Sequence, residues 1–268
     1  MSAGAALTTS PGALPRRDKV LVLAALAAVI LLAWGYLVLH SAHMSMEAAG
    51  HAMIGMPGMP WSAGQVGLTL LMWAVMMVAM MLPSATPMVL TYAAVVRRVA
   101  QEQSPTVSIA VFAAGYVLVW SGFSLAATGL QWTLEQMALL SPALVASSHR
   151  LGGALLILAG LYQWAPLKEF CLRYCQSPLG FISRHWRSGQ VGALRMGVRH
   201  GVYCVGCCWA LMLLLFVGGV MNLLWVAAIA GFVLVEKLVP TRSRLGRWIS
   251  GGGLVLAGAI VLSGFGGM

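Results

Sequence analysis

Charged residues are scarce in this chain, and acidic residues are the scarcest. Only 8% of the 268 residues are charged, with six Asp and Glu against sixteen Lys and Arg, whereas an average soluble domain is about 25% charged. Hydrophobic residues make up 60% of the chain. This composition excludes an ordinary soluble domain and predicts an all-α protein, a polytopic bundle of helices in a lipid bilayer.

The sequence motifs of common catalytic sites are also missing. The chain has no phosphate-binding loop, no nucleophile elbow and no helical two-histidine zinc motif. The missing nucleotide motif weighs against an ATP-driven pump, and nothing in the sequence identifies an enzyme. The net charge of +10 does not indicate nucleic-acid binding, because the basic residues fall between apolar runs and not along one face.

Seven apolar runs each approach the ~20 residues that are needed to cross a bilayer. The expected membrane helices are residues 20–39, 64–82 with an extension to 96, 107–132, 151–166, 202–221, 223–239 and 249–265. The first run is expected to be retained, because its apolar core exceeds the roughly 7–15 residues of a signal peptide. These helices are predicted to form one domain, residues 20–268, after a disordered tail of residues 1–19.

The basic residues predict the orientation of the bundle. If the N-terminus is cytoplasmic, almost all Lys and Arg lie on the cytoplasmic side, as in proteins that follow the positive-inside rule. Residues 167–201 then form a basic cytoplasmic loop, and residues 40–60 form a loop on the outer side. The pattern therefore predicts a multi-pass protein with a cytoplasmic N-terminus.

Five cysteines form two short groups, Cys204 with Cys207 and Cys208, and Cys171 with Cys175. A membrane helix that begins near residue 202 would hold the first group on one face of its first turn, where thiolates are favoured. Both groups are predicted on the cytoplasmic side, where thiols stay reduced unless they hold a metal, so a pair from each could complete one site. Thiolates suit Cu(I), and four of them also suit Zn(II). The alternative is that the cysteines pack as small apolar residues.

The second apolar run is rich in methionine. Its candidate thioether ligands are Met76, Met80, Met81 and Met88. Pro83 and Pro87 are expected to interrupt the helix, and irregular backbone at membrane depth must be buried in protein or line a cavity. Thioethers bind Cu(I), but methionine is also an adaptable packing residue, and the sequence leaves both interpretations open.

The predicted outer loop is rich in histidine and methionine. These residues are His40, His43, Met44, Met46, His51, Met53, Met56 and Met59. Imidazole binds Cu(II) or Zn(II), and thioether binds Cu(I), so the loop could capture metal ions. The alternative is a methionine-rich loop at the membrane interface without a ligand role.

One acid lies inside an apolar run. Glu236 is near the end of the run 223–239, next to Lys237. An acid in a membrane segment is a candidate metal or ion site, although a salt bridge near the helix end explains it equally well. Asn222, just before this run, is expected to cap the helix.

Several ordered motifs resemble those of a known family. They are the run 80–88 with Pro83 and Pro87, Gly160–Gln163 followed by Pro166–Cys171, Ser177–Phe181, His200–Trp209, Gly218–Asn222, and Glu236 with Lys237. Over about residues 64–265 the chain resembles the DUF2182 family, which consists of predicted metal-binding integral membrane proteins of bacteria. The resemblance implies an inner-membrane location and supports a metal role for the cysteines.

Together these features predict a membrane protein that handles a metal, with Cu(I) favoured and zinc as the alternative. The protein could transport the ion, deliver it to a periplasmic or cytoplasmic metal-carrying protein, or sense it. A second hypothesis is a membrane thiol–disulfide oxidoreductase that uses the same cysteines. A third is a structural assembly subunit without chemistry of its own. The sequence does not indicate the oligomeric state.

Overall fold

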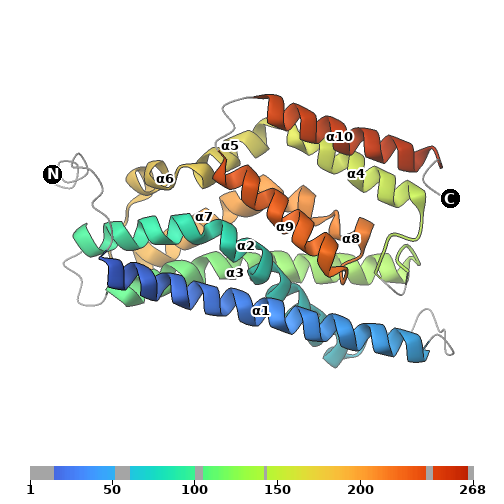
Figure 1. Ribbon diagram of the computed structural model, residues 1–268, viewed down its shortest axis with the longest axis horizontal. Helices are drawn as coiled ribbons and strands as arrows, with labels where there is room; N and C mark the ends of the chain where they lie inside the picture. Colours follow the sequence, from blue (N-terminus) through green and yellow to red (C-terminus); the bar gives the residue numbers. More distant parts are fainter. Residues whose placement is uncertain (1–14, 52–60, 100–104, 142–143, 240–243, 265–268) are drawn as a thin grey trace.

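Helices make up the regular secondary structure of the described part of the computed structural model, residues 15–51, 61–99, 105–141, 144–239 and 244–264. In chain order they are α1 (Arg16–His51), α2 (Ala63–Val99), α3 (Pro105–Gln136), α4 (His149–Gln163), α5 (Pro166–Gln176), α6 (Pro178–His185), α7 (Gly189–Met212), α8 (Leu215–Gly218), α9 (Leu223–Leu238) and α10 (Arg244–Leu262). Figure 1 shows α1, α2 and α3 running along the molecule on one side, with α10 lying beside α4 on the other.

Four helical segments of the described chain are long and apolar enough to cross a membrane. They are Arg16–Ala42, Ala63–Val99, Pro105–Gln136 and Gly189–Gly218. The all-helical prediction is therefore confirmed, but the predicted count of seven spans is not. The remaining apolar helices are shorter: α4 has 15 residues, α9 has 16 and α10 has 19, and crossing a bilayer takes about 20.

The two prolines of α2 do not interrupt it, which differs from the prediction. The helix continues through Pro83 and Pro87 to Val99. Hydroxyl groups bind the carbonyl oxygens around the prolines: Ser84 donates to Met81 over 2.8 Å and Thr86 donates to Leu82 over 3.1 Å. These bonds do not replace the backbone bonds lost at the prolines, since amides at positions 83 and 87 would have donated to the carbonyl oxygens of Ala79 and Pro83.

Two segments that were expected as loops contain helices. The predicted outer loop begins inside α1, which continues to His51, and residues 52–60 lie outside the described part of the chain. The predicted cytoplasmic loop 167–201 contains most of α5, all of α6 and the first half of α7. The tail predicted for residues 1–19 falls partly on α1, which begins at Arg16, and partly on residues 1–14, which are outside the description.

The start of α7 is the difference that matters most for the cysteines. A helix start near residue 202 was expected, because Arg195 and Arg199 interrupt the apolar run. The helix begins at Gly189, and both arginines extend from an exposed side of it while Ala193, Met196 and Gly197 are buried. Cys204, Cys207 and Cys208 therefore lie in the C-terminal half of α7, and the proposed effect of the first helical turn on these thiols is wrong.

Close packing between α3 and α7 fixes the position of the cysteine helix. At Gly197, an added Cβ would lie 2.0 Å from the carbonyl oxygen of Phe112. A side chain there would push the two helices apart, since small residues are what allow membrane helices to approach closely. The helices α4 and α10 also pack on each other, and Asn222 caps α9 as predicted, with its side chain accepting from the amide of Trp225.

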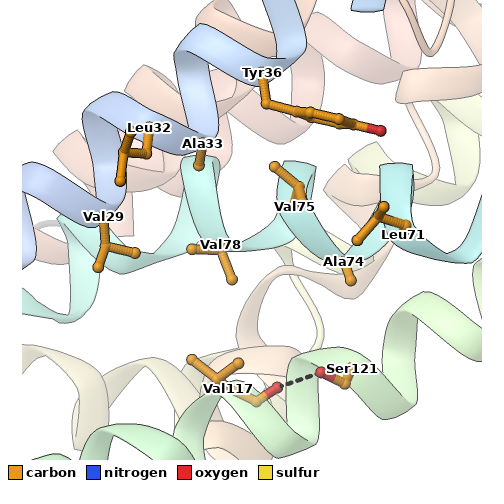
Figure 2. A pocket seen from close by; sticks show the side chains of 10 residues that line it. All are labelled: Val29, Leu32, Ala33, Tyr36, Leu71, Ala74, Val75, Val78, Val117 and Ser121. Carbon is orange, nitrogen blue, oxygen red and sulfur yellow. Dashed lines mark hydrogen bonds between the residues drawn. The ribbon is translucent and has the colours of Figure 1, made fainter.

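The helix α1 is the most loosely packed of the long helices. An apolar cleft of about 370 Å³ separates part of it from α2 and α3, and its lining includes Val29 and Leu32 of α1, Val75 of α2 and Val117 of α3 (Figure 2). Leu32 is also 74% exposed. An apolar helix with an exposed apolar surface is consistent with a lipid environment.

Candidate functional site

The helices α5 and α7 bring the two cysteine groups together, as the sequence predicted. The sulfur atoms of Cys175 and Cys207 are 4.0 Å apart. Cys171 also reaches α7, where a Cβ on Gly206 would lie 2.7 Å from its sulfur. Glycine at position 206 is therefore what allows Cys171 to lie against α7.

The thiols of α5 are neutral hydrogen-bonding groups in this arrangement. Burial raises the pKa of the Cys171 thiol. Hydrogen bonding to the sulfurs of Cys204 and Cys207 raises the pKa of Cys175. Both effects favour the protonated form in the metal-free protein, so metal binding at these residues would release protons.

The three cysteines of α7 are almost completely buried in the protein core. Their exposed fractions are 0–1%. The thiols of Cys207 and Cys208 donate to the carbonyl oxygen of Cys204 over 3.1 and 3.0 Å, and the sulfur of Cys208 is 4.0 Å from the sulfur of Met81. A thioether from α2 thus joins the thiols of α5 and α7.

Cys204 has a positively charged partner. The ammonium nitrogen of Lys237 lies 2.9 Å from its sulfur and 2.9 Å from the hydroxyl oxygen of Ser84, and the hydroxyl of Tyr116 lies 3.1 Å from the same sulfur. Lys237 is only 6% exposed, and lysine is rarely buried without a partner. The contacts therefore favour a thiolate at Cys204 that pairs with this ammonium group.

Glu236 takes part in a buried ion pair. Its carboxylate accepts from Lys168 over 2.7 Å, and the two side chains are 8% and 0% exposed. Gln176 donates to the backbone oxygen of Glu236 over 2.8 Å. The structure thus supports the salt-bridge explanation for Glu236, with a partner on α5. These contacts join α5 to α9 beside the cysteines.

The other predicted methionine ligands lie in the core. Met76 and Met80 are 0% and 1% exposed and belong to the same apolar cluster as the cysteines. Met88 lies in a second cluster with Tyr92 and Phe112. Packing accounts for all three positions, whereas the sulfur of Met81 contacts a thiol.

The histidines and methionines of residues 40–59 are not brought to the cysteines by any contact in the described part of the chain. His40 lies near the end of the well-described part of α1 and stacks on Tyr36 with ring centres 5.5 Å apart. The side chains of His43, Met44, Met46 and His51 and residues 52–60 lie outside the description. Capture of metal by this segment stays a prediction.

A buried histidine borders the site. His200 lies one helical turn before Cys204 on α7; it stacks on Tyr116 and meets Phe181 edge to face, with both ring centres 5.5 Å away. Within the described residues its Nδ1 atom has no hydrogen-bond partner although it is buried. An unpaired buried imidazole nitrogen is a candidate donor or acceptor for a bound group.

The donor atoms fit a soft metal, but they are arranged in pairs. In the described chain, no three His, Cys, Asp or Glu side chains meet closely enough to form a ready-made metal site. The close pairs are Cys175 with Cys207 and Cys208 with Met81. Sulfur donors of both kinds are those that Cu(I) prefers, so a Cu(I) ion fits the chemistry of this group after small side-chain movements.

Comparison with known proteins identifies the family. Residues 70–261, well over half of the chain, match the model of the PpoB2 family, described as a copper chaperone. The chain belongs to this copper chaperone family. The match gives copper as the metal of the family, which agrees with the predicted copper role, although the family name differs from the one that the sequence motifs resembled. No curated protein and no solved structure matches this chain.

Four residues of the site were not predicted as functional from the sequence. They are Lys237, Lys168, Tyr116 and Ser84. The two lysines were counted among the basic residues that set the orientation. Ion pairing could have been predicted, because the two lysines and Glu236 lie at the ends of apolar runs. Charges in such positions are costly unless they are paired.

Proposed function

We propose that this protein holds Cu(I) between sulfur atoms inside a bundle of membrane helices and delivers it to a partner protein. Cys204, Cys207 and Cys208 of α7 and Cys175 of α5 supply the thiols. Cys171 and Met81 are further donors. The observation that carries the proposal is the meeting of two distant cysteine groups in the core, with 4.0 Å between the sulfurs of Cys175 and Cys207.

The presence of Met81 favours Cu(I) over zinc. Zinc in proteins is bound by Cys, His, Asp and Glu, nearly always by four ligands in structural sites. A thioether is a soft ligand that suits Cu(I). The sulfur of Met81 is 4.0 Å from that of Cys208, which is the arrangement expected for a mixed thiolate and thioether site.

Lys237 balances the charge of the site. Cu(I) bound by two thiolates carries a net charge of −1, and such a charge is costly in an apolar core unless a positive group lies nearby. The ammonium group 2.9 Å from the sulfur of Cys204 supplies that charge. The same group pairs with Cys204 before copper binds, so the core is close to neutral in both states.

The proposed setting is the inner membrane of a bacterium, crossed several times by the chain. Long apolar helices and many exposed apolar side chains support this setting. The copper that enters or leaves the cysteines would pass to a metal-carrying protein on the cytoplasmic or periplasmic side. Transport through the membrane and sensing are variants of the same copper-binding role.

A thiol–disulfide oxidoreductase is the second candidate function. The Cys175 and Cys207 thiols are close enough in the structure to be considered a redox pair. Such a pair would become a disulfide while the disulfide of a partner protein became two thiols. Substitution of Met81 distinguishes the two functions, because a copper site uses its thioether and an oxidoreductase does not.

The test uses two matched methionine variants. Met81→Leu and Met88→Leu each remove one buried thioether and keep similar volume, but only Met81 lies beside a cysteine. The measurement is Cu(I) affinity by competition with a chromogenic chelator. We expect weaker binding for Met81→Leu and no change for Met88→Leu. Equal affinities in both variants, with full disulfide reductase activity retained, would favour the redox function.

A further inference from the structure

A cationic recess lies on α7 away from the cysteines. It has a volume of about 180 Å³ and is lined by His185 at the end of α6, Arg187, and Arg195, Met196 and Arg199 of α7. Since a water occupies about 30 Å³ of liquid, the recess has room for a group of a few heavy atoms. Its lining includes three arginines, and the Nδ1 atom of His185 lies 2.9 Å from the carbonyl oxygen of Phe181.

The arginines of this recess have no carboxylate partner in the described chain. Every carboxylate that the structure describes is engaged elsewhere. The partners are Arg97 for Asp18, Trp61 and Gln131 for Glu135, Arg173 and Arg247 for Glu169, and Lys168 for Glu236. Three arginines that line one recess carry like charges, and an anion bound between them would offset their repulsion. The recess therefore has the charge of an anion site.

The same face of α7 also carries exposed apolar residues. Val191, Arg195, Arg199 and Val202 follow one another at spacings of four, four and three residues, so they lie on one side of the helix. Val191 is 64% exposed and Val202 is 55% exposed. A ligand of this face should therefore combine an anionic group with an apolar part.

We propose that the recess binds the phosphate group of an anionic phospholipid, with the acyl chains lying along α7 over Val202. Arginine binds phosphate through two parallel hydrogen bonds. Basic pockets between membrane helices on the cytoplasmic side are typical sites for anionic head groups, and this recess lies in the segment that the charge distribution places on that side. An acidic partner protein would explain the arginines but not the exposed valines.

The matched variants are Arg195→Gln with Arg199→Gln, and Arg150→Gln as the control. Arg150 is an exposed arginine at the start of α4, outside the recess. The full-length protein is purified in detergent, and binding of phosphatidylglycerol and phosphatidylcholine is measured by native mass spectrometry. Melting in phosphatidylcholine nanodiscs checks that all variants are folded.

We expect the wild-type protein and Arg150→Gln to bind phosphatidylglycerol more tightly than phosphatidylcholine. The double variant should lose about 30-fold in affinity for phosphatidylglycerol, since each arginine near an anionic surface contributes about a fivefold effect. An unchanged affinity in the folded double variant would overturn the proposal. Displacement of the lipid by millimolar inorganic phosphate would overturn the lipid assignment. Arginine-dependent binding of polyglutamate without lipid binding would point to a protein partner and overturn it too.

Discussion

At the scale of single residues, Lys237 is the most specific feature of the cysteine site. Its ammonium group contacts the sulfur of Cys204 over 2.9 Å and is buried. Lys237→Met keeps the length of the side chain and removes the charge, so a thiolate at Cys204 would lose its counter-ion. We expect Cu(I) affinity to fall by about 10–100-fold, as for other partners of metal ligands. Chelator competition measures this loss.

The control for this prediction is Lys19→Met, which removes a charge from an exposed residue at the start of α1. Its Cu(I) affinity should equal that of the wild-type protein. If Lys237→Met also binds copper with wild-type affinity, then the ammonium group does not support the copper site.

Gly206 is the second residue that decides the geometry of the site. Gly206→Ala would place a Cβ 2.7 Å from the sulfur of Cys171, and overpacking of this kind typically costs about 1–3 kcal/mol. Removing the sulfur should relieve the clash, so the variant with both Gly206→Ala and Cys171→Ala should unfold at a higher temperature than Gly206→Ala alone. Thermal unfolding of the single and double variants checks this. Additive losses in the double variant would show that the two residues do not touch.

At the scale of helices, the pair of Lys168 and Glu236 joins α5 to α9. Removing one partner of a buried ion pair typically costs about 3–5 kcal/mol, whereas replacing both by apolar residues is often neutral. We therefore expect Glu236→Leu to be destabilised and Lys168→Met with Glu236→Leu to recover most of the stability. The free energy of unfolding is the measurement.

The same double variant decides the role of Glu236, which the sequence made a candidate metal ligand. In the structure its carboxylate contacts Lys168 at 2.7 Å. We expect the folded double variant to bind copper with wild-type stoichiometry. Loss of copper from a protein that remains folded would show that Glu236 is a ligand.

A further acid, Glu169, links α5 to α10. Glu169 contacts both Arg173 and Arg247, and these hydrogen bonds lower the pKa of its carboxyl group. A carboxyl group whose pKa is lowered by folding stabilises the folded state at pH values above the ordinary pKa of the group. This stabilisation is lost as the pH falls through the lowered pKa. Glu169 is 37% exposed, so the effect is small because water screens the pair.

The helices show which parts of the structure could be predicted from the sequence. Length and hydropathy predicted the longer apolar helices but not α5 and α6, which lie in a segment expected as a loop. The i,i+4 spacing placed Cys204 and Cys208 on one side of α7. Helix ends were less predictable. The charges of Arg195 and Arg199 interrupt the apolar pattern, so this segment was expected to be a loop. In the structure both arginines lie on one exposed face of α7. The continuity of α2 through Pro83 and Pro87 was not predicted either, because proline ordinarily breaks a helix and the sequence does not show where tertiary packing overrides this tendency.

At the site, the sequence predicted that the two cysteine groups could meet, but not the charges that surround them. The sulfur atoms of Cys175 and Cys207 are 4.0 Å apart, as expected if the two groups share one site. The contact of Lys237 with Cys204 joins residues 33 positions apart, and only the packing of α7 against α9 creates it. The contact between the sulfurs of Met81 and Cys208 likewise joins two helices, α2 and α7, and the sequence does not show which methionine of α2 makes it.

At the scale of the whole molecule, the orientation in the membrane stays a prediction. The positive-inside rule places residue 45 outside and residue 190 in the cytoplasm. In a background in which all five cysteines are Ser, Ser45→Cys should react with a membrane-impermeant maleimide on intact cells. Gln190→Cys should react only after permeabilisation. Reaction of both on intact cells would reverse the side on which the arginines of α7 lie.

Binding of copper by sulfur atoms in the core can be measured by metal analysis together with X-ray absorption at the copper edge. The samples are the copper-loaded wild-type protein and the variant with Cys204, Cys207 and Cys208 changed to Ser. We expect the wild-type protein to hold copper as Cu(I) with sulfur neighbours, and the variant to lose this copper while remaining folded. The same amount of copper with the same sulfur neighbours in both proteins would contradict copper binding by these cysteines.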